Sequence, residues 1–521
     1  MGFISANRSQ SHMFGYSLDD FVDSDSKCHH IVRWVERLDM SAVFADYSTQ
    51  GGDAFDPRIM LATWFLAYSE GETSTRKLEQ LCKRDTHFIF VSAHLQPDHC
   101  SLSRFRKRHG HCLPDLFVQI LRLAAEDGVS EFSLIAVDGT KIEAQASRKQ
   151  NRTSKTLAEQ LAKIRTRIQN YLERCDLADE SAAPESVEEI RKRIELLRAE
   201  EQKLLSRQRT LEARKETLQS KNKDNHRINL AEPEARSMKP VNGKPVAPAY
   251  NAQVSVDTDS RLIVAVDVTD APTDQQQFSR QHPKVESNLP ANADRAYVAD
   301  AGYNCLEQLE YVEQQQVDVV MADPRLDHRS GGKVKPGKPY PRSMFEYNEA
   351  EDCYRCPAGQ LLTYWHTEKS RGRFKRVYRY RACQGCSQQK QCLGEKKRKI
   401  VQRTLRRDTM EHLAESMNVK SRTGSGRRRM SVRKQTVEPI IGNLKANLGF
   451  RRFSLSGLAA VRGEFALMCI AHNLNRLIGL IRGQSGSDPR TDWPWRRVGA
   501  ILGSFWSIIL GKWTLPRKST A

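Results

Sequence analysis

Three acidic side chains lie where a divalent cation could be bound. Asp138 stands at the polar end of the apolar run SLIAVDGTKIEA (residues 133–144), and Asp300 directly follows the run RAYVA (residues 295–299). Carboxylates at the ends of neighbouring strands can converge above one edge of a sheet, and hard cations such as Mg²⁺ prefer oxygen ligands. An Asp followed by Gly after a strand is also an ordinary turn feature, so neither residue is diagnostic by itself.

The third acid, Glu438, is surrounded by cations. Its neighbours in the sequence include Arg427, Arg428, Arg429, Arg433, Lys434 and Lys445. A solvated helix face usually mixes charges, whereas a metal–phosphate site needs a carboxylate for the metal and cations for the DNA backbone. Seven residues separate Glu438 from Lys445, about two helical turns, which predicts that both side chains project on one side.

The charge of the chain is concentrated in one block. The 521 residues carry 83 Lys and Arg against 63 Asp and Glu, a net charge of +20. Residues 325–452 hold 32 of these basic residues and 11 of the acidic ones, a net charge of +21. This asymmetry favours a polyanionic partner, with nucleic acid ahead of an acidic membrane surface. A solvated basic face is the alternative.

Four cysteines have the spacing of a zinc ribbon. They form the pairs Cys353-x-x-Cys356 and Cys383-x-x-Cys386, and the strand-like runs 361–365 and 374–380 between them could form a hairpin. Four thiolates suit tetrahedral Zn²⁺ and leave no open position, so the site would be structural. The alternative is a set of reduced thiols left from an ancestral site.

The elements that must position these residues are mixed. Residues 17–125 are typical of short helices, one of which carries Arg104, Arg106, Lys107 and Arg108. Such a module suits DNA contact, although a plain helical bundle with a basic surface fits equally well. Strands are expected at 133–144, 250–257, 262–269, 295–299 and 317–322, with a helix at 305–314. This order predicts a mixed α/β sheet with helices packed on it.

A long charged insertion interrupts this sheet between residues 154 and 224. Its apolar residues recur with heptad spacing, and a break at 176–184 turns the chain back, which predicts an antiparallel helical hairpin. A dimer element, a DNA-facing arm and a simple spacer all remain open. The apolar run at 498–511 is short for a membrane span and is expected to be a packed helix.

Together these motifs resemble the DDE transposases of bacterial insertion sequences, in the branch with an N-terminal helical domain and a ribonuclease H-like catalytic domain. The resemblance covers residues 17–478 and depends on the segment Phe55–His109, the Asp138-Gly-Thr strand, the Asp300-Ala-Gly-Tyr element and the Glu438 helix. It implies that Asp138, Asp300 and Glu438 form the catalytic triad. It also implies two Mg²⁺ (or Mn²⁺) ions, which activate an attacking oxygen and stabilise the leaving one.

Relatives carry further residues on the last helix, and this chain matches them in part. Lys445 fits the family's Lys. The place of the family's Arg, four residues before Glu438, holds Lys434 with Arg433 beside it, and the place of its Tyr holds Ser431. The resemblance therefore extends to Lys445 and leaves the two upstream roles open.

The resemblance and the residue patterns predict six segments. A helical DNA-binding domain occupies 1–130, and the ribonuclease H-like core begins in 131–153 and 226–324. The helical hairpin is inserted at 154–225, and a basic Cys-rich insertion occupies 325–400. The core ends with the Glu438 helix in 401–480, and 481–521 form a C-terminal tail.

The predicted function is that of a transposase. It would cleave DNA at the terminal inverted repeats of its element and transfer the strands to target DNA. The expected partner is double-stranded DNA, both transposon ends and target, and the expected assembly is a homodimer. Twelve cysteines without an export signal favour the reducing cytoplasm, at the nucleoid and away from membranes. The alternatives are a non-catalytic DNA-binding protein derived from a transposase and a nuclease without strand transfer.

Overall fold

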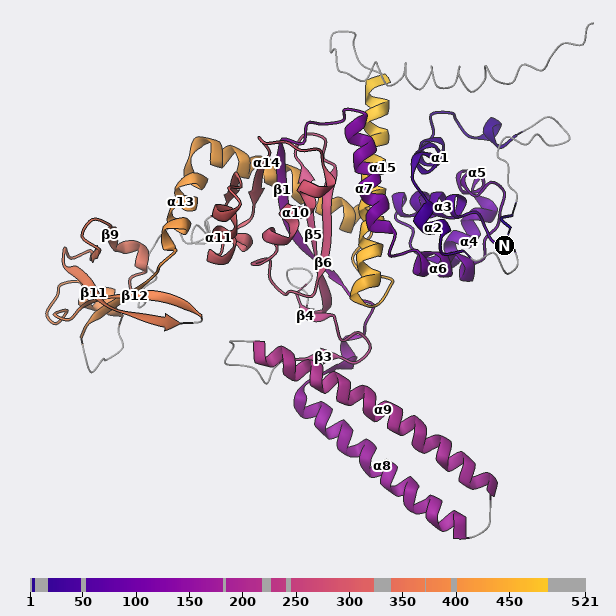
Figure 1. Ribbon diagram of the computed structural model, residues 1–521, viewed down its shortest axis with the longest axis horizontal. Helices are drawn as coiled ribbons and strands as arrows, with labels where there is room; N and C mark the ends of the chain where they lie inside the picture. Colours follow the sequence, from indigo (N-terminus) through magenta and orange to yellow (C-terminus); the bar gives the residue numbers. More distant parts are fainter. Residues whose placement is uncertain are drawn as a thin grey trace, which may run out of the picture. The chain divides into compact units, whose positions relative to one another are not determined.

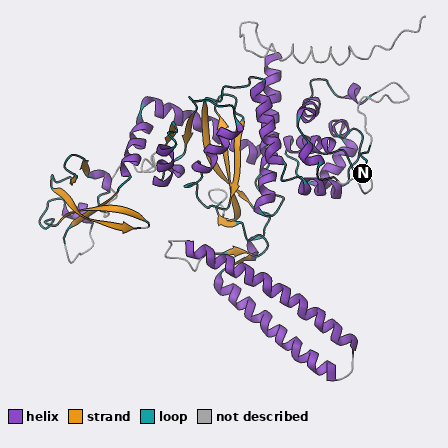
Figure 2. Cartoon of the chain, in the orientation of Figure 1, coloured by secondary structure: helices purple, strands orange, loops and turns teal. Residues whose placement is uncertain are grey.

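The computed structural model describes residues 2–4, 17–47, 53–180, 184–217, 226–239, 245–322, 339–370, 372–394 and 401–485. The chain divides into two compact units, each with helices and strands (Figure 1, Figure 2). The first contains Met1–Asp274, Arg280–Arg295 and Lys434–Ala521, and the second contains Gln275–Ser279 and Ala296–Arg433. The architecture is mixed α/β, as predicted. The expected helix at 498–511 lies outside the described residues.

The N-terminal part of the first unit is a succession of short helices, which confirms the prediction for residues 17–125. Side chains at the helix starts explain several boundaries. Asp56 accepts a 2.8 Å hydrogen bond from the Arg58 N–H at the start of α3, where Pro57 takes the first helical position. The helices are η1 Leu18–Phe21, α1 Lys27–Arg37, α2 Ser41–Phe44, α3 Pro57–Ser69, α4 Thr75–Arg84, α5 Thr86–Val91, α6 His99–Arg108 and α7 Leu113–Glu126.

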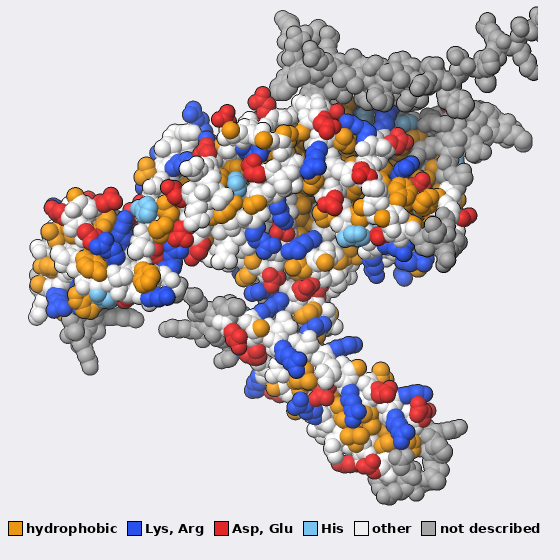
Figure 3. Space-filling view, viewed as in Figure 1, with side chains coloured by type: hydrophobic (Ala, Val, Ile, Leu, Met, Phe, Trp, Pro, Cys, Tyr) orange, Lys and Arg blue, Asp and Glu red, His pale blue; other side chains and the backbone are white. Residues whose placement is uncertain are grey.

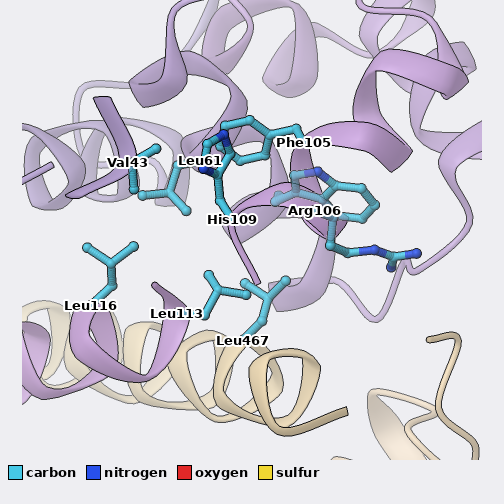
Figure 4. Close-up of a pocket in the computed structure, with 9 residues that line it drawn as sticks. Val43, Leu61, Phe105, Arg106, His109, Leu113, Leu116 and Leu467 are labelled. Carbon is cyan, nitrogen blue, oxygen red and sulfur yellow. The ribbon is translucent and has the colours of Figure 1, made fainter. Parts of the chain in front are cut away.

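Helix α15 (Leu458–Ser485) joins these helices to the strands of the same unit, since it packs against α3, α7 and strand β6. Leu467 of α15 meets Leu113 and Leu116 of α7 and Leu61 of α3 around a small cavity (Figure 4). The cavity measures about 10 Å³, the space of a single water. It is therefore a packing gap rather than a ligand site. Among the described residues, none of the helices combines the length and the apolar character needed to cross a membrane.

An antiparallel group of strands forms the core of the first unit. Its strands are β1 Leu134–Glu143, β4 Arg236–Met238, β5 Ala247–Asp257 and β6 Ile263–Thr269. Strand β5 lies between β1 and β6 and is buried along its whole length. The β5–β6 turn is held by Asp257, whose carboxylate accepts a 2.8 Å hydrogen bond from the Ser260 N–H. The predicted hairpin around residues 258–261 is thus confirmed.

The insertion in this unit is an antiparallel helical hairpin, as predicted. Helices α8 (Ser154–Glu180) and α9 (Pro184–Thr217) bury a shared apolar seam that includes Leu161, Leu197 and Leu204. Basic, acidic and hydrophobic side chains are intermixed over the outer surface seen in Figure 3. At the base, β2 (Asn151–Arg152) follows the short helix η2 (Arg148–Gln150) and pairs with β3 (Ile228–Asn229), which closes the insertion.

The second unit begins with a parallel pair of strands. Strand β7 (Ala296–Ala299) pairs with β8 (Val319–Met321), and between them in sequence lie η4 (Ala301–Tyr303) and α11 (Leu306–Gln314). Helix α13 (Glu411–Arg422) packs against α11 and β8. Helix α10 (Phe278–Asn288) precedes β7, and α14 (Gly424–Gly442) and the π-helix η6 (Asn443–Asn447) follow α13 in sequence.

A separate antiparallel sheet of the second unit lies beside the cysteine pairs, of which only Cys353 belongs to a strand. Its strand order is β13-β12-β11-β10-β9, and α12 (Gln389–Leu393) follows β12 in sequence. The predicted hairpin of strand-like runs is confirmed as β11 and β12. The bounds are β9 Glu346–Asn348, β10 Cys353–Arg355, β11 Leu361–Ser370, β12 Arg373–Tyr380 and β13 Arg403–Asp408, with the short helix η5 Arg342–Met344 before them.

Candidate active site

Asp138 lies in the middle of β1 rather than at its end. Residues 135–137 are buried, and Asp138 is the first half-buried residue after them. The strand continues to Glu143 because β5 offers a pairing partner along the whole stretch, with Asp138 opposite Val254. One carboxylate oxygen of Asp138 accepts a 2.8 Å hydrogen bond from the Gly139 N–H. The partly exposed position keeps this carboxylate within reach of a hydrated cation.

A polar network beside Asp138 was missed by the sequence analysis. The carboxylate of Asp274 lies 3.1 Å from the Lys141 ammonium group and accepts 2.8 Å hydrogen bonds from the side-chain amides of Asn251 and Gln253. Polar residues at alternate positions of an otherwise apolar strand are the signal that could have revealed it. Both amides belong to buried β5, where unpaired polar groups are costly.

Gly139 is required by the same network. A Cβ atom at residue 139 would lie 2.3 Å from the Gln253 amide nitrogen and 2.5 Å from an Asp274 carboxylate oxygen. Both distances are shorter than any van der Waals contact, so a side chain here would displace the network. The Asp-Gly pair is therefore a packing requirement beside the acid and not a turn.

The segment after Glu438 is attached to the strand that carries Asp138. Lys445 donates a 2.8 Å hydrogen bond to the backbone carbonyl of Lys141. Farther along, the Glu143 N–H donates to the Arg451 carbonyl at 3.1 Å, and the Arg452 guanidinium lies 2.7 Å from the Glu143 carboxylate. These contacts fix the end of the Glu438 segment against β1. Glu438 itself is exposed on α14.

Lys445 lies on the π-helix η6, and this changes the expected geometry. A π-turn closes hydrogen bonds between residues five apart, so seven residues no longer equal two α-helical turns. Burial lowers the pKa of Lys445 to about 8, and repulsion by the Lys141 ammonium group contributes. A nearby phosphate would offset both penalties, since its negative charge favours the protonated ammonium group.

Asp300 belongs to the second unit and directly follows β7, as predicted. Its side chain is half exposed and lies 3.7 Å from the guanidinium of Arg433, which is itself buried. Asp318, at the start of the next strand, is held by Arg429 at 2.8 Å and by Lys420 at 2.7 Å. The hydrogen bond from Arg429 is the main cause that lowers the pKa of Asp318 to about 2.

The basic residues predicted to bind DNA fall into two groups. Arg104, Lys107, Arg108, Arg427, Arg428 and Lys434 are exposed. Arg429 and Arg433 are ion-paired to Asp318 and Asp300, and Lys445 is half-buried. The first group is the better suited to DNA, because its exposed side chains can meet phosphate without giving up an ion pair such as Arg429–Asp318 or Arg433–Asp300.

Arg106 departs from the prediction because it is part of the core. Only 6% of it is exposed, and it donates a 2.9 Å hydrogen bond to the Tyr68 hydroxyl. The guanidinium also lies over the Trp64 ring, 4.5 Å from its centroid, and Tyr68 in turn donates to the fully buried Glu464 at 3.3 Å. A buried carboxylate needs nearby positive charge, so Arg106 serves the interior rather than DNA.

The cysteine pairs are only partly brought together. Cys356, Cys383 and Cys386 line one pocket of the second unit together with Cys392, but Cys353 does not line it. Cys353 is buried in strand β10, and its thiol lies 3.6 Å from the Glu351 carboxylate.

Two family models match the chain. Residues 355–478, which include Glu438 and Lys445, match the model described as "Transposase DDE domain". Residues 16–108 match the model described as "Transposase domain (DUF772)". Asp138 and Asp300 lie outside both matches. No curated protein and no solved structure matches the chain. The matches confirm the resemblance to DDE transposases of insertion-sequence type, and the two domains indicate transposase function and binding to DNA.

Proposed function

We propose that this protein is a DDE transposase that cleaves DNA at the terminal inverted repeats of an insertion sequence and transfers the strands to target DNA. The observation that carries the proposal is the DDE-domain match around Glu438, combined with the Lys445–Lys141 contact that ties this segment to the Asp138 strand. We further propose that the core is ribonuclease H-like and that the enzyme acts as a homodimer at the nucleoid, because both element ends must be processed.

Asp138, Asp300 and Glu438 are the proposed ligands of two Mg²⁺ or Mn²⁺ ions. All three are half-buried or exposed, and their oxygen donors suit a hard cation. When bound, such ions activate an attacking oxygen and stabilise the leaving one. Water first hydrolyses a phosphodiester bond at the element end and releases a 3′-hydroxyl. That hydroxyl then attacks a target phosphodiester, forms the new bond and expels the 3′-oxygen of the target strand.

The chain's own cations bind and orient the DNA backbone in this proposal. The exposed residues Arg427, Arg428 and Lys434 would hold phosphates near Glu438. Lys445 would gain a counter-ion, which favours the charged form of this half-buried side chain. Arg433, paired with Asp300, would partly neutralise that carboxylate before metal binds.

The test uses a labelled duplex that contains the DNA flanking the gene, incubated with full-length protein, a target plasmid and Mg²⁺ or Mn²⁺. Asp138→Asn, Asp300→Asn and Glu438→Gln should each reduce cleavage more than about a hundredfold, because each removes a metal-binding charge with little change of shape. DNA binding in a gel-shift assay should stay near the wild-type level. Glu131→Gln and Asp294→Asn, at exposed acids before β1 and β7, are matched controls and should cleave normally.

The products distinguish the proposal from its alternatives. Cleavage followed by joining of the label to the plasmid supports a transposase, whereas cleavage without joining supports a nuclease. Binding without cleavage in either metal supports a non-catalytic DNA-binding protein. A triad variant that cleaves at the wild-type rate would remove that residue from the site.

A further inference from the structure

Four cysteines of the second unit line one open pocket beside the small five-stranded sheet. They are Cys356, after β10, Cys383 and Cys386, after β12, and Cys392 in helix α12. Arg403 completes one wall and donates a 2.9 Å hydrogen bond to the Cys392 carbonyl. Three separate stretches of chain therefore contribute cysteines to the lining of one pocket.

The turns that carry these thiols have the form of metal-binding loops. The Gly359 N–H donates to the Cys356 carbonyl at 2.8 Å, and the Gln360 N–H lies 3.3 Å from the Cys356 sulfur. A backbone N–H aimed at sulfur stabilises a thiolate. At the other turn the Cys386 N–H donates to the Cys383 carbonyl at 3.4 Å, and Gly385 has a φ of +78°. Such a φ favours glycine, which allows the tight turn between the two cysteines.

Helix α12 brings the fourth thiol. The Gln389 N–H donates to the Cys386 carbonyl at 3.0 Å and the Cys392 N–H to the Gln388 carbonyl at 2.8 Å, so the helix starts directly at the second cysteine pair. Cys392 therefore follows Cys386 by six residues and lines the same pocket.

Cys353 lies outside the pocket because side chains alternate between the two faces of a strand. It is paired in β10 with Asn348 on one side and Thr363 on the other, and successive residues of a strand point to opposite faces. Tyr354, the next residue of β10, therefore faces the opposite side of the sheet from Cys353. Cys356 and Cys392 pack against the apolar cluster of this sheet, which contains Tyr354 and Tyr378, whereas Cys353 is not part of it.

We propose that Cys356, Cys383, Cys386 and Cys392 bind one structural Zn²⁺ ion, with Cys392 in the place that the sequence pattern assigned to Cys353. Binding would replace the four S–H bonds by four Zn–S bonds of about 2.3 Å and release four protons. Among the described residues, no three of these four thiols lie within 4.8 Å of one another, so the side chains must move closer together when metal binds. All four positions are protein ligands, which leaves none for substrate.

The small size of the sheet explains why it would need a metal. Its apolar cluster contains only five buried residues among those described, namely Phe345, Tyr354, Leu362, Tyr378 and Leu405. So small a core rarely stabilises a fold unaided, and a metal that ties three chain segments together compensates. This inference does not depend on the proposed function, because its test measures metal and not DNA chemistry.

The experiment compares the metal content of full-length protein, purified without chelator, with that of two matched variants. We expect about one zinc per chain in the wild type and in Cys353→Ser, and less than about a tenth of that in Cys392→Ser. Zinc lost in Cys353→Ser but kept in Cys392→Ser would overturn the ligand assignment. Iron in place of zinc, or no bound metal in the wild type, would overturn the site.

A measurement on the native chain covers the case in which Cys392→Ser fails to fold. Wild-type protein is alkylated with and without prior chelation, and the modified peptides are mapped by mass spectrometry. Cys356, Cys383, Cys386 and Cys392 should become reactive together after chelation, because the metal protects thiolates. Protection of Cys353 in step with Cys356, with Cys392 reactive throughout, would contradict the proposal.

Discussion

Lys445 offers a sharp test of the electrostatics beside β1. Burial and the Lys141 ammonium group lower its pKa from 10.5 to about 8 in the folded protein. The folded pKa lies below the unfolded one, so the folded state binds fewer protons between about pH 8 and pH 10.5. Charged Lys445 therefore destabilises the protein in full below about pH 8. This penalty is lost as the pH rises toward 10.5.

The magnitude follows from the shift. A pKa change of that size corresponds to a destabilisation of roughly 3 kcal/mol at 1.36 kcal/mol per pKa unit. Because Lys445 is partly exposed, solvent screening reduces this destabilisation to about 1–2 kcal/mol. Lys445→Met removes the charge but keeps an apolar stem. Relative to this variant, the wild type should therefore gain about 1–2 kcal/mol of stability between about pH 7 and pH 10.

Urea unfolding followed by circular dichroism at both pH values measures this difference. The hydrogen bond from Lys445 to the Lys141 carbonyl is lost in the variant at every pH, so it cancels in the comparison. Lys434→Met, at an exposed lysine of the same segment, is the control and should show no such change. The reasoning would be refuted if the wild type and Lys445→Met differed in free energy of unfolding by the same amount at the two pH values.

Two further predictions concern the basic residues. Binding to duplex DNA should weaken steeply with salt, and an affinity independent of salt would contradict this prediction. Replacing Arg427, Arg428 and Arg429 together by Gln should reduce the slope of log affinity against log salt by about two to three and leave the sequence preference unchanged. Filter binding across a salt series measures both the affinity and the slope. Arg106→Met should lower the free energy of unfolding by about 2–4 kcal/mol, because it removes positive charge near buried Glu464. Arg104→Met, at an exposed arginine of the same helix, should weaken DNA binding and leave the midpoint of urea unfolding unchanged. The opposite pattern for these two arginines would show that Arg106 faces DNA.

Local signals in the sequence predicted much of the fold. The hairpin turn at 258–261, the strand before Asp300 and the helix that carries Glu438 all follow from composition and periodicity, which depend on neighbouring residues. The helical insertion was equally accessible, since its apolar residues repeat every seven positions and pack in the seam as expected.

The remaining features depend on residues far apart in the chain. Arg106 looks like a surface cation because its partners, Tyr68 and through it Glu464, are distant in sequence. The spacing Cys-x-x-Cys does not say whether Cys353 lies in a strand or a turn, and that choice decides the direction of its thiol. The position of the π-turn at Lys445 likewise does not follow from local sequence, because it depends on how the helix end meets Lys141.

The closed base of the helical insertion also has a consequence for folding. More than a hundred residues separate Glu143, at the end of β1, from Ala247, at the start of β5, yet these strands pair directly. Once α8 and α9 have paired, the contact between Asn151 and Asn229 shortens the effective loop between β1 and β5 roughly fourfold. The entropic free-energy cost of closing that loop then falls by about 1 kcal/mol. A hairpin of local contacts can form fast, before the slower pairing of distant strands. When the insertion folds first, β1 and β5 therefore pair as if a much shorter loop joined them, and their pairing should be correspondingly faster.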